Sequence, residues 1–450
     1  MLFNKHTALL IIFAMLWTMN LSAQDYHYWS EQYGGDASLL GGAAIAGVGD
    51  NSAIYYNPGA MAFQPSYQKF SISANAYRVR YITSEHGLGE GLHFESFNMI
   101  VSPQLLAGII HFKKAPKWRL SYALLTKNMY HFKLNTQESF IADVLPEEEG
   151  EEYFIGNYEF ENSLLDQWVG VGASFMISDH FAIGLSHFGI YRTYKYHNNI
   201  ELTAFPVDTA YHSISEFRSS INFDYHNISG IFKLGLAWDY DKFAIGLNFT
   251  SPTFGLFGKA NEQRIFKILN LNFLTSEDFA VIDREEKMSS HHKFPGSIGV
   301  GLNYVISKKV VTYFSAEYFF PLGEYYVFSS TVKPKSYPEL TEPEIEEIFG
   351  NAPFISFIEA SKQVFNVGVG VRWIWKESLS FLGGFRTDFN HNALGDFDMQ
   401  RVVAESINWD IYYLSLGIRR TTKKILTAGL EFSFSPKTKT NSFVNPWKLT

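Results

Sequence analysis

Three arginines, Arg372, Arg386 and Arg419, occur in three successive segments of alternating sequence and share the polar side of that alternation. A guanidinium is a planar, permanently charged donor that can hold a carboxylate through two parallel hydrogen bonds. If this side faces an enclosed and largely apolar space, the arginines could bind the carboxylate of an apolar acid. Arg386 is preferred, because it lies eight residues beyond the short turn at 376–378, and a rise of about 3.3 Å per residue places it near mid-barrel.

Other charged residues share the same side, so the alternative is that these arginines form ion pairs within the protein. The inward charges that the alternation predicts, besides the three arginines, are Arg119, Lys233, Glu317, Asp388 and Glu431. Barrel interiors are commonly polar. The sequence leaves both roles open.

Two phenylalanines, Phe354 and Phe357, are further candidates for ligand contact. They lie in a long connection, 321–362, that also carries the capping-box pattern Thr341-Glu342-Pro343-Glu344. The pattern predicts one or two short amphipathic helices. These helices could shape an apolar capture groove, or they could simply pack the connection onto the rest of the molecule.

The elements that must position these residues are strands, because large apolar residues alternate with small or polar ones. In 363–376, for example, Val367, Val369 and Val371 alternate with Gly368 and Gly370. Similar runs recur at 242–256, 293–306 and 424–435. A period of two predicts strands with two unlike faces.

Connections between these runs alternate in length, which is typical of a transmembrane antiparallel β-barrel with short periplasmic turns. The long connections are 134–161, 203–213, 253–292, 321–362 and 390–404. Thirteen strands can be counted within 66–436. About fourteen are expected, because single-chain bacterial barrels have an even number. We expect either that the tail, 437–450, is truncated before a last strand or that a hairpin near 250–290 is miscounted.

The first residues are predicted to be a signal peptide, 1–23, with Lys5 before an apolar stretch and Ala23 at a suitable cleavage site. The alternative is a membrane anchor, which the short apolar stretch disfavours. The chain has 450 residues, no cysteine and a net charge of −8, which argues against a nucleic-acid partner. Motifs for hydrolases, metal sites and phosphate binding are not found, so we expect no enzyme activity, cofactor or metal.

The segment 24–65 is rich in small residues and contains Gly41-Gly42-Ala43 and Tyr56-Asn57-Pro58-Gly59-Ala60-Met61-Ala62. With the preceding signal peptide, it resembles the FadL-type family of outer-membrane transporters for long-chain fatty acids and aromatic hydrocarbons. The resemblance implies an N-terminal hatch that plugs the lumen, with Gly41, Gly42, Asn57, Pro58 and Gly59 as hatch residues. The alternative is an ordinary periplasmic linker.

Pro103 interrupts an otherwise continuous strand, where it cannot donate to a sheet ladder. The resemblance implies that Ser102-Pro103-Gln104 forms a kink through which ligand leaves sideways into the membrane. The alternative is a bulge that only adjusts curvature.

These observations predict passive uptake of hydrophobic compounds through the outer membrane of a Gram-negative bacterium. The partners expected are an apolar ligand, the surrounding lipid and lipopolysaccharide, and the barrel-assembly machinery. An outer-membrane lipid-hydrolysing enzyme and a structural or adhesive barrel are the alternatives.

Overall fold

The computed structural model describes residues 26–65, 69–84, 94–145, 150–208, 214–271, 278–330, 333–341, 343–345, 353–394 and 410–435. The predicted signal peptide, 1–23, and the tail, 437–450, lie outside the described residues. No helix among the described residues is long and apolar enough to cross a membrane.

The described chain begins with three short helices and continues almost entirely as strands. The helices are α2 (Gly35–Leu39), α3 (Ala53–Tyr56) and the 3-10 helix η1 (Pro58–Phe63). The strands are β1 (Phe70–Ser84), β2 (Phe94–His111), β3 (Trp118–Ala142), β4 (Glu152–Ser178), β5 (Phe181–Pro206), β6 (Ser215–Asp239), β7 (Phe243–Thr250), β8 (Phe254–Leu269), β9 (Phe279–Ser289), β10 (Ser297–Ser307), β11 (Val310–Phe319), β12 (Leu322–Ser329), β13 (Lys335–Tyr337), β14 (Ser356–Ser361), β15 (Val364–Lys376), β16 (Leu379–Asp388), β17 (Ile411–Thr421) and β18 (Ile425–Phe434).

The main sheet is antiparallel and follows the order β1-β2-β3-β4-β5-β6-β7-β10-β11-β15-β16-β17-β18. These thirteen strands correspond to the thirteen counted in the sequence, so the predicted all-β antiparallel architecture is confirmed. Among the described residues, β1 and β18 share no ladder and form the two edges of the path.

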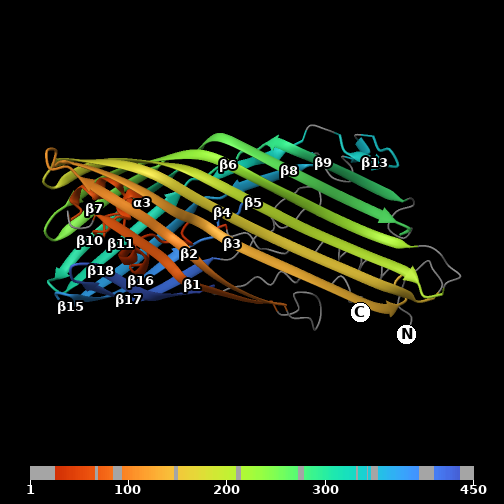
Figure 1. Ribbon diagram of the computed structural model, residues 1–450, viewed down its shortest axis with the longest axis horizontal. Helices are drawn as coiled ribbons and strands as arrows, with labels where there is room; N and C mark the ends of the chain where they lie inside the picture. Colours follow the sequence, from red (N-terminus) through yellow and green to blue (C-terminus); the bar gives the residue numbers. More distant parts are fainter. Residues whose placement is uncertain are drawn as a thin grey trace.

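Two of the predicted long loops are strands instead. Within 134–161, β3 runs to Ala142 and pairs with β4 from Glu152 onward. Within 253–292, β8 continues the course of β7 along β6, and β9 pairs with β8. Their outward residues are polar, as Glu159 and Glu161 are in β4, so these runs look like loops in the sequence. The strands β3–β6, β8 and β9 therefore extend well past the rest of the sheet (Figure 1).

The connection 321–362 also differs from the prediction. Strands β12 and β14 pair with each other in a small separate sheet, and all six residues of β14 are buried. The capping box is present, since the Thr341 backbone N–H and hydroxyl both donate to Glu344 Oε2 at 2.7 Å. These hydrogen bonds lower the pKa of the Glu344 carboxyl below its usual range.

An exposed apolar belt surrounds the half of the sheet that lies next to the short turns. Typical members are Val169 in β4, Leu185 in β5, Leu234 in β6 and Leu416 in β17, each at least 40% exposed. Contiguous apolar surface of this extent requires an apolar environment. The belt matches the lipid-facing band expected of a transmembrane sheet.

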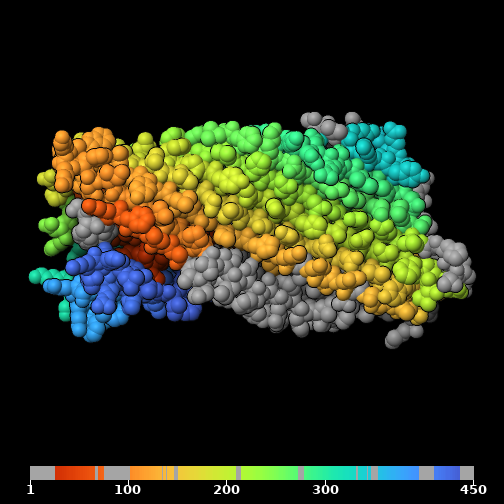
Figure 2. Space-filling model, viewed as in Figure 1, coloured from red at the N-terminus to blue at the C-terminus, as the bar shows by residue number. Residues whose placement is uncertain are grey.

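The N-terminal segment 26–65, called here the plug segment, is enclosed by the sheet. The helix η1 contacts β3–β7, whereas α2 contacts β16–β18, so the segment touches strands that are far apart in the strand path. The sheet therefore curls around the segment. Figure 2 shows part of it between the early strands and the last strands of the sheet.

Glycines on the inner face of the sheet let the plug segment approach the wall backbone. A Cβ added at Gly370 would lie 2.6 Å from the Leu40 carbonyl oxygen, and one at Gly59 would lie 2.7 Å from the Gly235 carbonyl oxygen. Wall glycines that would meet the segment in this way are Gly184, Gly235, Gly246, Gly301, Gly368, Gly370, Gly384, Gly417 and Gly429. The small residues of the alternating pattern thus mark the contact surface of the plug segment.

We predict that Gly370→Val weakens the seating of the plug segment, because a side chain there collides with the Leu40 backbone. Overpacking of this kind costs about 1–3 kcal/mol. The measurement is limited proteolysis of the purified protein, read as the cleavage rate within 26–65, together with the thermal unfolding midpoint. Gly383→Val on the next strand is the control, since a Cβ at Gly383 makes only an ordinary 3.5 Å contact with Leu416. Equal cleavage rates in the two variants would contradict the prediction.

Candidate functional site

Two of the three predicted arginines hold the start of α2. Asp36 Oδ2 accepts from Arg372 Nη2 at 2.6 Å and lies 2.9 Å from Arg419 Nη1. Thr427 Oγ1 donates to the other Asp36 oxygen at 3.0 Å. One buried carboxylate of the plug segment therefore links β15, β17 and β18.

Arg386 is fully buried and holds the segment six to seven residues before Asp36. Its guanidinium donates to the backbone oxygens of Trp29 and Ser30 at 3.2 and 3.3 Å. It also forms a two-point ion pair with Glu431 and lies 3.6 Å from the Tyr413 ring centroid. All three arginines are thus engaged by protein groups. The contacts favour the structural role over the free guanidinium that a ligand carboxylate would need.

Inward acidic residues complete the attachment of this stretch. Trp29 donates through its backbone N–H to Asp388 at 3.0 Å and through its indole N–H to Glu317 at 2.9 Å. Glu317 also accepts from Ser297 Oγ at 2.6 Å. The predicted inward positions of Arg386, Asp388, Glu317 and Lys233 are confirmed by their burial.

The five predicted hatch residues all make close contacts, either within the plug segment or with the wall strands. Gly41 and Gly42 have φ angles of 65° and 71°, which L-residues rarely adopt, and they let the chain turn against the Phe385 backbone. The Asn57 side chain donates to Ile45 O at 2.8 Å and to Leu236 O at 2.9 Å, and its oxygen accepts from Gly59 N at 2.9 Å. Pro58 begins η1 directly after this cap.

The predicted kink coincides with two discontinuities of the sheet. The register between β1 and β2 shifts at Pro103, which lies opposite Ala74, while Leu105 lies opposite Ser73. Gln104 is therefore an extra residue, and it faces inward with Leu105. The ladder between β2 and β3 covers only Leu105–His111 of β2, so it ends beside the bulge. The wall is interrupted at Ser102-Pro103-Gln104.

Two buried lysines lie where the plug segment meets the wall, and with the aromatic side chains around them they are called here the lysine cluster. Lys127 Nζ donates to Tyr28 O at 2.5 Å and to Tyr55 OH at 3.0 Å. Lys233 Nζ donates to Thr250 Oγ1 at 2.9 Å and lies 4.5 Å from the Tyr55 ring centroid. Among the described residues, no carboxylate lies within ion-pair distance of Lys233. A buried ammonium without such a partner is costly unless something compensates its charge.

Aromatic rings complete the lysine cluster. The ring centroid of Trp168 lies 6.0 Å from that of Tyr55 and 5.6 Å from that of Phe294. The ring centroid of Tyr28 lies 5.2 Å from that of Phe294, and the Tyr28 ring stacks on the His391 ring with a centroid distance of 3.9 Å. The lysine cluster thus combines apolar aromatic surface with two cations.

Lys127 was not predicted to be a site residue, although it lies on the same side of the alternating pattern as Arg119 and is therefore expected to face inward. In the structure it is the extra residue of a bulge, because Thr126 lies opposite Gln167 and Asn128 lies opposite Asp166. Bulges often re-aim a side chain beside a functional site. Lys233 was predicted to face inward, but its lack of a carboxylate partner could not be read from the sequence.

Phe354 and Phe357 lie apart from the arginines, in a second group of buried aromatic residues, called here the upper aromatic cluster. The ring centroid of Phe357 lies 4.7 Å from that of Phe223 and 5.9 Å from that of Phe328. The Arg264 guanidinium carbon lies 4.6 Å from the Phe354 ring centroid. The strands β12 and β14 bring these rings onto the inner face of β5, β6 and β8. Both phenylalanines are therefore buried core residues rather than part of an exposed capture groove.

We predict that Arg386→Met destabilises the protein by about 1–3 kcal/mol, because the Trp29 and Ser30 carbonyl oxygens lose their buried donor and the partly exposed Glu431 carboxylate loses its partner. The double variant Arg386→Met/Glu431→Met should lose less than the single variant, since no charge is then left unpaired. The free energy of unfolding in urea in the presence of mild detergent gives both values. If the single variant loses less free energy of unfolding than the double variant, the Arg386–Glu431 pair does not hold the plug segment in place.

Known structures share this fold. The crystal structure of the Pseudomonas putida toluene transporter TodX has 13% sequence identity, with 92% of this chain and 93% of that chain covered and a TM-score of 0.55. The CymD monoaromatic hydrocarbon channel has 10% identity, coverage of 90% and 93%, and a TM-score of 0.53. A Pseudomonas aeruginosa FadL homologue has 12% identity, coverage of 93% and 91%, and a TM-score of 0.50. No protein-family model and no curated protein matches the sequence. The chain has the fold of the FadL-type outer-membrane transporters, as the resemblance of its N-terminal residues implied.

Proposed function

We propose that this protein is a passive outer-membrane transporter for hydrophobic compounds that carry an acidic group, such as long-chain fatty acids. The observation that carries this proposal is the lysine cluster between the plug segment and the upper aromatic cluster. In the proposal, a binding chamber opens here when the plug segment moves. The aromatic rings suit an apolar body, while Lys127 and Lys233 suit a carboxylate. The similar solved structures, which include a toluene transporter and a FadL homologue, support the broader role in hydrophobic uptake.

The route below the chamber is obstructed, which favours a sideways exit. The plug segment fills the lumen against the wall glycines, with Asn57 linking it to β6. A polar, water-filled path to the periplasm would require the whole segment to leave. The interrupted wall at Ser102-Pro103-Gln104 offers an apolar compound a shorter path into the membrane.

Small movements of the plug segment could couple the chamber to this exit. Glu31 of the segment accepts from Gln104 Nε2 at 3.5 Å, and Tyr33 OH donates to Thr126 O at 3.4 Å on the opposite side of the interruption. Both contacts are long for hydrogen bonds and are therefore weak. In this mechanism the ligand enters the chamber, displaces these contacts and leaves between β2 and β3 down its own concentration gradient.

We predict that Pro103→Ala lowers the uptake rate of a radiolabelled long-chain fatty acid, because a residue with a backbone N–H can extend the ladder across the interruption. Pro252→Ala is the matched control, since Pro252 lies in the break between β7 and β8, away from the β2–β3 interruption. The measurement is uptake by cells that depend on this protein. If both variants take up the compound at the wild-type rate, the ligand does not leave at Pro103.

We predict that Lys233→Met weakens binding of a fatty acid about tenfold and leaves binding of the corresponding alcohol unchanged. A lost charge-assisted hydrogen bond is worth about 1.5–3 kcal/mol, which corresponds to at least this factor. Lys242→Met, in the exposed turn before β7, controls for a general change of charge. Equal weakening for acid and alcohol would show that Lys233 only supports the fold.

A further inference from the structure

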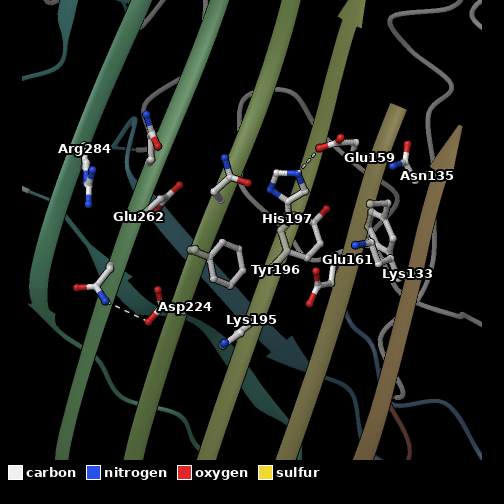
Figure 3. A pocket seen from close by; sticks show the side chains of 15 residues that line it. Lys133, Asn135, Glu159, Glu161, Lys195, Tyr196, His197, Asp224, Glu262 and Arg284 are labelled. Carbon is white, nitrogen blue, oxygen red and sulfur yellow. Dashed lines mark hydrogen bonds and ion pairs between the residues drawn. The ribbon is translucent and has the colours of Figure 1, made fainter. Parts of the chain in front are cut away.

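A second surface stands out on the outer face of the extended strands. The outward residues of β3–β6, β8 and β9 beyond the apolar belt are polar, and they surround a shallow groove of about 610 Å³ (Figure 3). The floor of the groove is the sheet itself, where Phe160, Tyr196 and Phe223 turn to the other face and pack in the upper aromatic cluster. The floor is therefore rigid.

Cross-strand pairing arranges the groove side chains in a line. Six residues that lie opposite one another in register, called here the polar row, are Lys133, Glu161, His197, Asn222, Gln263 and Arg284. Neighbouring strands are about 4.8 Å apart, so the polar row extends roughly 24 Å across the sheet. Hydrogen-bond donors and acceptors recur at each step.

Part of the hydrogen-bonding capacity of this surface is left for a ligand. Among the described residues, the Gln263 side-chain amide makes no hydrogen bond, and neither Lys133 nor Lys195 is in an ion pair, although all three line the groove. By contrast, His197 is 3.2 Å from Glu159, and Asn261 donates to Asp224 at 3.1 Å. Charges of both signs are present, so the groove does not favour a strongly charged partner.

We propose that the polar row binds the saccharide chain of the glycolipid that surrounds the protein in the outer leaflet. A sugar presents hydroxyl groups that both donate and accept, and a pyranose ring is about as wide as the spacing between strands. The groove begins where the apolar belt ends, which is the level at which lipid-linked sugars lie. The groove is outside the lumen, so the proposal does not depend on what the protein transports.

The test is a titration of the purified protein in mild detergent with polysaccharide released from outer-membrane glycolipid by mild acid. We expect saturable binding that Asn222→Ala/Gln263→Ala weakens about tenfold, because two hydrogen bonds are lost. The matched control is Gln137→Ala/Asn157→Ala. These two amide residues lie opposite each other in the β3–β4 ladder, on the same face of the sheet but away from the groove. The control should bind within twofold of the wild type.

Three results would overturn the proposal. The wild type would show no saturable binding, or both amide pairs would weaken binding equally, or only intact glycolipid would bind while the released polysaccharide did not. A salt titration separates sugar from phosphate recognition. Binding through sugar hydroxyl groups should persist at about 0.5 M salt. A steep loss of affinity with salt would show instead that phosphate groups of the polysaccharide bind Lys133 and Lys195, and would contradict the proposal.

Discussion

The close approach of two backbones is the constraint on which the rest of the structure depends. The plug segment can lie against the wall only where the inner face carries glycine, as at Gly370 and Gly235. Once it is seated there, Asp36 reaches Arg372 and Arg419, and the carbonyls of Trp29 and Ser30 reach Arg386. The proposed function rests on the same contacts, since the seated segment obstructs the lumen there.

Much of the fold follows from local alternation, and the parts that were wrong have a common physical cause. The period of two located every strand of the main path, because lipid outside and small residues inside give each strand unlike faces. Beyond the apolar belt both faces change character, so the extensions of β3 and β4 were predicted to be a loop. The inward positions of the arginines were predictable, but their partners were not, because Asp36 is 336 residues from Arg372 in sequence. The same long separation hides the lysine cluster, whose side chains come from the plug segment and several strands.

The structure treats its inward cations in two ways. The three arginines are engaged with carboxylates and carbonyls of the protein and therefore stabilise the seated plug segment. Lys233 instead has a hydroxyl and a ring as neighbours, and in the proposed function its charge is met by a ligand. Beyond the lysine cluster, Phe357 of β14 packs on Tyr194 and Phe223 of the inner face of β5 and β6. Beside Pro103, the ladder between β2 and β3 ends, and the proposed exit lies there.

Ion conductance in a planar lipid bilayer tests most directly whether the plug segment closes the lumen. With the segment held by the wall glycines and the arginines, the purified protein should give no steady open-pore current at moderate voltage. Deletion of 34–60 should produce a large stable conductance, because it removes the obstruction and leaves the strands in place. A porin-like current from the intact protein would contradict the account, since an aqueous path would then run through the lumen and a sideways exit would be unnecessary.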